Sequence, residues 1–188
     1  MEIDQCVEKI VSGDTTYFNI LVKQLQTPIY TLVVRMIGDR DLAKDLTQDI
    51  FLKVYKNLAT YNRSVKITTW IYTIATNTCI DYLRKKKDVL LFEDRQQLEI
   101  EHKVYALPEK FLENQELRQH IYEKIDLLPE HYRIIVILKY VNELTFEEIA
   151  SVLDQPTNTI KTKLYRAKEM LKAHLSETWM ERSEHYGM

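Results

Sequence analysis

Lysine and arginine side chains recur along one segment near the C-terminus, where their spacing would place them on the exposed surface of a helix. Five cations lie there against a single acid, Glu169: Lys161, Lys163, Arg166, Lys168 and Lys172. Lysine and arginine bind phosphate groups, and arginine also pairs with guanine edges in the major groove. The chemistry indicated is therefore binding to DNA rather than catalysis.

Two predicted helices and a short turn would position these cations. Thr145 and Glu148 have the spacing of a capping box, in which each side chain satisfies a backbone N–H of the other residue. An apolar stripe follows until Pro156, which disfavours helix at the residue before it. The second helix has its own inner stripe, formed by Ile160, Leu164, Ala167 and Leu171. This pattern predicts a helix-turn-helix, whose second helix fits the major groove.

The composition predicts an all-α chain. Its 188 residues include only three glycines and four prolines, too few for a fold rich in loops or sheets. No apolar run approaches the roughly 20 residues that cross a bilayer, and Glu2 and Asp4 stand where a signal peptide would be basic. Cys6 and Cys79 are too few for a disulfide framework. We expect a cytoplasmic protein with reduced thiols, no cofactor and no membrane insertion.

Charge is segregated along the sequence. The net charge is only −2, but acids gather between residues 88 and 130, while residues 84–87 and 161–172 are basic. Two local basic clusters predict two separate footprints on nucleic acid instead of one diffuse basic surface.

The segregated charge also suggests two helical domains. In the first, Gly38 predicts a helix end and Asp39 or Asp41 a helix start, with a loop at 59–66 and a helix at about 68–86. Pro28 would start or kink a segment. Residues 88–110 read as a flexible acidic linker, and the second domain begins near residue 111. The run 134–138 has strand propensity, but helical patterns on both sides favour a buried helix.

The helix at 68–86 carries a polar surface that suits nucleic acid. With Ile71, Ile74, Ala75 and Thr78 facing inward, the outer face would hold Tyr72, Thr73, Thr76, Asn77, Asp81, Arg84 and Lys85. Aromatic, hydroxyl, amide and cationic groups together can hold unpaired bases, where stacking contributes about 1–3 kcal/mol per base. Trp70 fits a core position better than a stacking platform.

Three segments together, 43–62, 68–87 and 128–171, resemble the extracytoplasmic-function (ECF) bacterial sigma factors. The resemblance implies a promoter-recognition subunit of RNA polymerase, with residues 1–87 as region 2, 88–110 as linker and 111–188 as region 4. It departs from the family at the turn of the helix-turn-helix, where Asp154 stands in place of a frequent glycine. Asp tolerates the left-handed conformation better than most residues.

The resemblance also implies three sets of binding residues. The surface for core polymerase would comprise Asp45, Gln48, Asp49 and Phe51. Recognition of the −10 element would use Tyr61, Lys66, Tyr72, Thr73, Thr76, Asn77, Arg84 and Lys85. Recognition of the −35 element would use Asn158, Thr159, Lys161, Thr162, Tyr165 and Arg166.

The partners implied by the resemblance are core RNA polymerase, promoter DNA and an inhibitor. On the polymerase, the contacts would be the clamp helices of the β′ subunit and the β flap. The inhibitor would be an anti-sigma factor, often membrane-anchored, that blocks the core-binding surfaces.

Two alternatives remain from the residues alone. A conventional helix-turn-helix repressor or activator would bind duplex DNA without polymerase. This alternative assigns no function to the acidic surface around Asp45 and Asp49. An enzyme would need catalytic or metal-binding motifs. Asp45 and Asp49 have no histidine nearby, and Glu99 with His102 forms only an isolated Glu-x-x-His in the linker. We expect no catalytic residue and no metal site.

Overall fold

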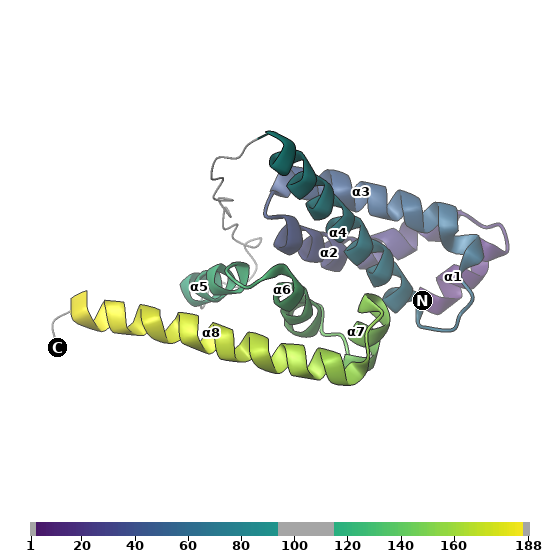
Figure 1. Cartoon of the computed structure of the whole chain (residues 1–188). Helices are drawn as coiled ribbons and strands as arrows, with labels where there is room; N and C mark the ends of the chain where they lie inside the picture. The colour runs from purple at the N-terminus through teal and green to yellow at the C-terminus, as the bar shows by residue number, and fades with distance from the viewer. Residues whose placement is uncertain (1–2, 94–114, 186–188) are drawn as a thin grey trace.

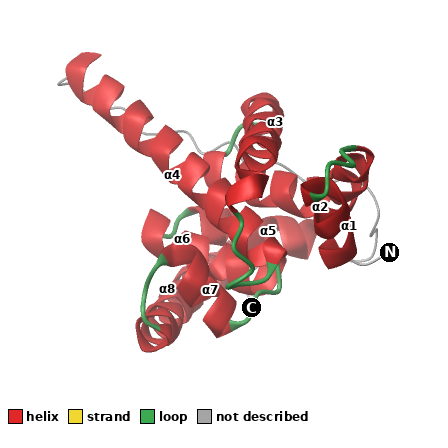
Figure 2. Ribbon diagram, turned by 90° about the vertical axis from the view of Figure 1, so that its right-hand side faces the viewer, coloured by secondary structure: helices red, strands yellow, loops and turns green. Residues whose placement is uncertain are grey.

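Helices make up most of the computed structural model, which describes residues 3–93 and 115–185. No strand occurs among these residues, and Figure 2 shows helices throughout. The prediction of an all-α chain is confirmed, and the run 134–138 is helical. Most of the predicted linker, with Glu99 and His102, lies outside the described residues.

The N-terminal half begins with three helices: α1 (Ile3–Val11), α2 (Thr16–Ile37) and α3 (Arg40–Asn57). Residues at the helix ends fix where α2 stops and α3 starts. Gly38 ends α2 in the left-handed conformation, with φ of 73°, as predicted. The Asp39 carboxylate then caps α3 by accepting hydrogen bonds from the backbone N–H groups of Asp41 and Leu42. Pro28 does not start a helix, because it lies inside α2. Helix α1 was not predicted from the sequence.

The fourth helix crosses the first three and closes the core of the N-terminal half. After the short helix η1 (Leu58–Thr60) and a loop, α4 runs from Ile67 to Glu93. It therefore continues past the predicted end at about residue 86, into the segment assigned to the linker. Its buried residues Ile71, Ala75 and Cys79 recur every four positions, so one face of α4 packs on α2 and α3.

The C-terminal half begins with α5 (Gln115–Asp126) and continues with α6 (Glu130–Val136). The π-helical turn η2 (Ile137–Val141) extends α6, and α7 (Phe146–Leu153) and α8 (Thr157–His185) complete the half. Helix α8 is the long helix at the lower edge of Figure 1.

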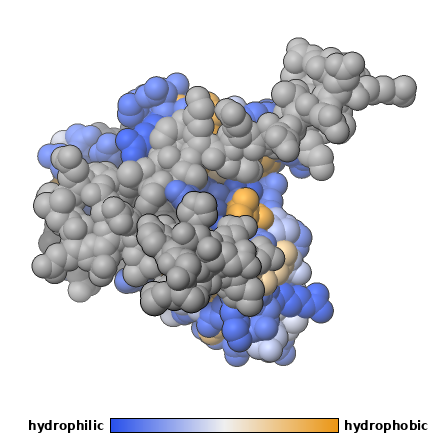
Figure 3. All heavy atoms as spheres, turned by 90° about the vertical axis from the view of Figure 1, so that its left-hand side faces the viewer, coloured by the Kyte–Doolittle hydropathy of each residue, from blue (hydrophilic) through white to orange (hydrophobic). Residues whose placement is uncertain are grey.

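The two halves pack against each other. Helix α7 lies along α4, and α2 contacts both α6 and η2, so buried residues of both halves form one hydrophobic cluster. In Figure 1, α7 lies beside the N-terminal part of α4. On the face drawn in Figure 3, the described atoms are mainly hydrophilic, with a small hydrophobic area between them. The contact between the halves decides which predicted binding residues are exposed.

Candidate nucleic-acid interface

The helix-turn-helix is built by the cap and turn that the sequence predicts. The Thr145 hydroxyl accepts a hydrogen bond from the Glu148 N–H (3.2 Å), and the Glu148 carboxylate accepts one from the Thr145 N–H (2.9 Å). Asp154 ends α7 in the left-handed region, with φ of 49° and ψ of 52°. The Lys163 ammonium donates to the Gln155 side chain at 2.7 Å, which ties α8 to the turn. Both helices are therefore held in a fixed relation.

Helix α8 presents its predicted DNA-binding residues to solvent. Ile160, Leu164 and Ala167 are buried on the inner side. Of the six residues predicted for the −35 element, Thr159 is half-buried. The other five are exposed on the opposite side of the helix: Asn158, Lys161, Thr162, Tyr165 and Arg166. Tyr165 is 66% exposed, which is unusual for a residue with a large aromatic side chain. This surface combines two cations with groups that donate and accept hydrogen bonds.

The predicted −10 surface on α4 is only partly accessible. Asn77, Arg84 and Lys85 are exposed and Thr73 is half-buried. The expectation that Tyr72 and Thr76 lie on the outer surface is wrong, because they are 6% and 0% exposed. The physical reason is that the C-terminal half packs against this face: the Asn142 side chain donates to the Tyr72 hydroxyl at 3.2 Å.

The loop at 61–66 lines an open hollow of about 410 Å³ beside α1. The Tyr61 hydroxyl donates to the Val65 carbonyl at 2.6 Å, and its ring lies 5.5 Å from that of half-buried Trp70. Arg63 adopts φ of 59° and pairs with Glu8 at 3.2 Å. A loop held by these contacts offers an aromatic wall and cationic groups, which suits an unstacked base.

The predicted core-binding residues divide into two groups. Asp45, Gln48 and Asp49 are exposed on α3, as a binding surface requires. Phe51 is only 7% exposed, so it is not part of the exposed strip, and its role as a contact residue stays a prediction. It belongs to the buried face of α3, and it lines a groove of about 550 Å³ together with residues of α2.

Sequence analysis missed the apolar residues of this groove. Phe18, Val22 and Tyr30 from α2 line it together with Leu52 from α3, whose side chain is 55% exposed. The signal available in the sequence was Leu52 itself, a large apolar residue that the helical period places outside the buried stripe of α3. Large apolar groups that are left exposed mark protein-binding surfaces.

Three contacts between the halves were also missed. Lys66 pairs with Glu148 at 2.8 Å, and Asn142 donates to the Pro28 carbonyl at 3.1 Å. The Arg35 guanidinium, 4% exposed, lies 3.5 Å from the centre of the Tyr122 ring. Burial lowers the pKa of Arg35. The spacing of residues along the sequence does not predict these contacts, because each one joins residues far apart in the chain.

Metal sites and membrane-spanning helices are absent from the described residues. They contain no group of three or more His, Cys, Asp or Glu side chains that could hold a metal ion. No helix in the described ranges is long and apolar enough to cross a membrane.

Two sequence families match separate parts of the chain. Residues 21–89 match the family described as Sigma-70 region 2, and residues 118–171 match the one described as Sigma-70, region 4. Together the matches cover more than half of the chain. They contain α3, most of α4 and the helix-turn-helix.

Curated relatives match almost the whole length. The ECF RNA polymerase sigma factor SigW of Bacillus subtilis (strain 168) is 34% identical over 184 residues, covering 94% of this chain and 98% of SigW. The ECF RNA polymerase sigma-E factor of Escherichia coli (strain K12) is 32% identical over 172 residues, covering 88% of this chain and 90% of that factor.

Solved structures share the fold. CnrH, solved in complex with the cytosolic domain of CnrY, has a TM-score of 0.70 at 17% identity, over 94% of this chain and 99% of CnrH. The sigma factor RpoE from Bartonella quintana, solved with the anti-sigma factor NepR, has a TM-score of 0.71 at 20% identity, over 85% and 96% of the two chains. The sequence matches settle the family: the chain belongs to the ECF RNA polymerase sigma factors.

Proposed function

We propose that this sigma factor binds core RNA polymerase and directs it to promoters with −35 and −10 elements. Residues 1–87 would bind the polymerase and the −10 element, 88–110 would connect the halves, and 111–188 would bind the −35 element. The protein would act in the cytoplasm by binding alone, with no catalytic residue and no cofactor of its own.

The exposed surface of α8 carries the proposal. Lys161 and Arg166 are exposed cations on one helix, and both can reach phosphates or guanine edges in a major groove. Tyr165 lies between them in the sequence, where its exposed ring can meet a base methyl group. Asn158, Thr159 and Thr162 lie in the first turns of the same helix, the part of a recognition helix that contacts bases.

Core polymerase would bind at α3. Asp45, Gln48 and Asp49 offer an exposed polar and acidic strip, and the neighbouring groove offers exposed Leu52. An apolar centre with a polar rim is the usual anatomy of a protein interface. Phe51 would act from the wall of the groove, as a contact for a side chain inserted there.

The −10 element would bind at the loop 61–66 and along α4. The hollow beside Tyr61 and Lys66 would take an extruded base, and Asn77, Arg84 and Lys85 would follow the strand along the helix. Holding unstacked bases favours melted DNA over duplex, because the binding free energy offsets the cost of unstacking.

An anti-sigma factor would control the protein. The neighbour RpoE was solved with the anti-sigma factor NepR, and CnrH with part of CnrY. By analogy, we expect the present chain to bind a membrane-anchored anti-sigma factor. That inhibitor would cover the α3 surface and the groove beside it.

Reconstituted transcription tests the proposal. Core polymerase with and without the chain would transcribe genomic DNA, and mapping the RNA 5′ ends would identify promoters that depend on the chain. A promoter found in this way is then tested as duplex and as pre-melted DNA. The expected result is initiation only with both proteins present. Tight binding of the chain alone to duplex DNA, with no chain-dependent transcript, would instead indicate a conventional repressor or activator.

A further inference from the structure

We infer that a cleft between α4 and the C-terminal half binds a small zwitterion of the amino-acid class, one with an apolar side chain. The walls of the cleft come from α4 on one side and from α6, α7 and α8 on the other. The inference goes beyond the proposed function and does not depend on it, because the occupant is a small molecule and not promoter DNA or polymerase.

The size of the cleft sets the size of the ligand. Protein interiors are close-packed and leave few voids larger than a water molecule, whereas this cleft measures about 320 Å³. Pockets for small molecules commonly measure about 300–1,000 Å³, and they often lie where two packed units meet. A cleft at the lower end of that range suits a single amino acid better than a nucleotide.

Apolar side chains form the middle of the cleft. Ile80 comes from α4, Ile134 from α6 and Leu153 from α7, and all three line the same opening. Ile80 and Leu153 are only half-buried, so part of their apolar surface meets water when the cleft is empty of ligand. An apolar side chain bound among them would remove that surface from water, which is favourable.

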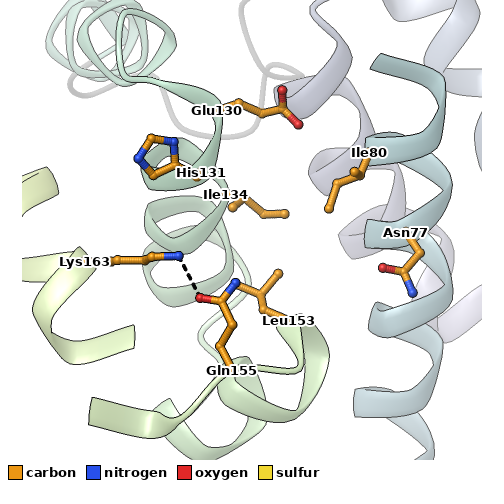
Figure 4. A pocket seen from close by; sticks show the side chains of 8 residues that line it. All are labelled: Asn77, Ile80, Glu130, His131, Ile134, Leu153, Gln155 and Lys163. Atoms are coloured by element: carbon orange, nitrogen blue, oxygen red, sulfur yellow. Dashed lines mark hydrogen bonds between the residues drawn. The ribbon is translucent and has the colours of Figure 1, made fainter. Parts of the chain in front are cut away.

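Lys163 supplies a cation toward the lower end of the cleft in Figure 4. This residue is half-buried, and its ammonium donates to the Gln155 side-chain oxygen at 2.7 Å. An ammonium carries three N–H donors, and the Gln155 amide is neutral, so this hydrogen bond leaves the charge of Lys163 unbalanced. A carboxylate in the cleft would accept another of these donors in a charge-assisted hydrogen bond.

Glu130 supplies an anion toward the upper end of the cleft, and Ile134 lies between it and Lys163 in Figure 4. Glu130 is exposed in the first turn of α6, so it can pair with a ligand ammonium. A ligand with both charges matches the two ends, whereas a simple anion would meet Glu130 without a partner for it. The Asn77 amide on the facing wall offers a further donor and acceptor.

The test is an NMR titration of the isotopically labelled, full-length chain with four compounds. L-phenylalanine carries all three groups, 3-phenylpropionate lacks the ammonium, phenethylamine lacks the carboxylate, and glycine lacks the apolar side chain. Phenylalanine should bind with a roughly millimolar Kd, as a ligand of this size allows, and should shift the amide signals of Ile80 and Leu153 on opposite walls. The loss of the ammonium should weaken binding about two- to fivefold, and the loss of the carboxylate on the order of tenfold.

Two variants locate the charged groups of the ligand. In Glu130→Gln, phenylalanine and 3-phenylpropionate should bind equally well, because the partner of the ammonium is gone. In Lys163→Met, phenylalanine and phenethylamine should bind equally well for the corresponding reason. Each comparison uses two ligands on one variant, so an effect of the substitution on folding cancels. The matched control is Glu147→Gln, which removes an exposed acid of α7 outside the cleft and should keep both differences.

Three results would overturn the inference. They are no shifts at tens of millimolar phenylalanine, equal affinities for all four compounds, and a Glu130→Gln variant that still distinguishes phenylalanine from 3-phenylpropionate. Shifts confined to the groove between α2 and α3 would also overturn it, since that groove is larger and has an apolar lining of its own. Failure of the ligand site would leave the proposed function standing, because transcription with core polymerase is measured without any of these compounds.

Discussion

Lys66 and Glu148 lie 82 residues apart in the sequence, and their side chains meet at 2.8 Å. Glu148 also caps α7 through the Thr145 N–H, so one carboxylate both starts a helix and joins the halves of the chain. The hydrogen bond from Lys66 is the main reason that the pKa of Glu148 lies below its ordinary value, and the cap lowers it further.

This lowered pKa predicts a pH dependence of stability. A carboxyl group whose pKa falls on folding stabilises the fold above its unfolded value, here about 4.5, and that stabilisation is lost as the pH falls through the folded value. The difference in free energy of unfolding between wild type and Glu148→Gln should be constant near neutral pH and shrink below about 4.5. Urea titrations at several pH values measure it. We expect less than about 1 kcal/mol, because Lys66 is largely exposed; a difference that grows with acid would contradict the assignment.

The capping box gives a second prediction, on stability alone. Thr145→Ala removes the hydroxyl that accepts the Glu148 N–H, and it should lower the free energy of unfolding by about 1 kcal/mol. Thr145→Ser keeps an acceptor at the same place and should recover most of the loss. Urea midpoints of the three proteins check this, and equal midpoints for Ala and Ser would show that the cap contributes nothing.

Features set by neighbouring residues were predictable from the sequence. Gly38, Asp39 and Asp154 act within a few positions of themselves, so their types alone indicated a helix end, a cap and a left-handed turn. The burial of Tyr72 depends instead on Asn142, on the other half of the chain. A helical period can tell which face of α4 is less apolar. It cannot tell that another part of the chain covers that face.

The third prediction concerns Cys79, which is 0% exposed in the core of the first half. Burial raises the pKa of its thiol to about 12, against the smaller opposing effect of Lys53. Because the thiolate is the reactive form, Cys79 should resist a thiol reagent at neutral pH and react fully in urea. The variant Lys56→Cys, which adds a cysteine at an exposed position of α3, is the control. Rapid reaction of Cys79 in the native protein would show that α4 leaves the core easily.

The fourth prediction tests the α3 surface. Asp45→Ala with Gln48→Ala should weaken binding to core polymerase by about tenfold, since both exposed side chains lie in the proposed contact surface and truncating a single hot-spot residue there costs more than about 1 kcal/mol. Fluorescence anisotropy with labelled protein measures the affinity. The exposed acid Glu147 on the other half, changed to Gln, is the control. The double variant should keep the wild-type urea midpoint; a lower midpoint would make the weaker binding an effect on folding.

The fifth prediction tests the α8 surface. Lys161→Ala with Arg166→Ala should weaken holoenzyme binding to a promoter with an intact −35 element, by about 1–3 kcal/mol for each cation that pairs with a base. Lys172→Ala is the matched control, because it removes an exposed cation of the same helix outside the predicted contact set. If a lost contact goes to a base, randomising the −35 sequence should abolish the difference between wild type and variant. If it goes to a phosphate, the difference should persist on any sequence and fall as salt rises. An effect of Lys172→Ala equal to that of the double variant would mean that α8 attracts DNA by charge alone, without reading the −35 element.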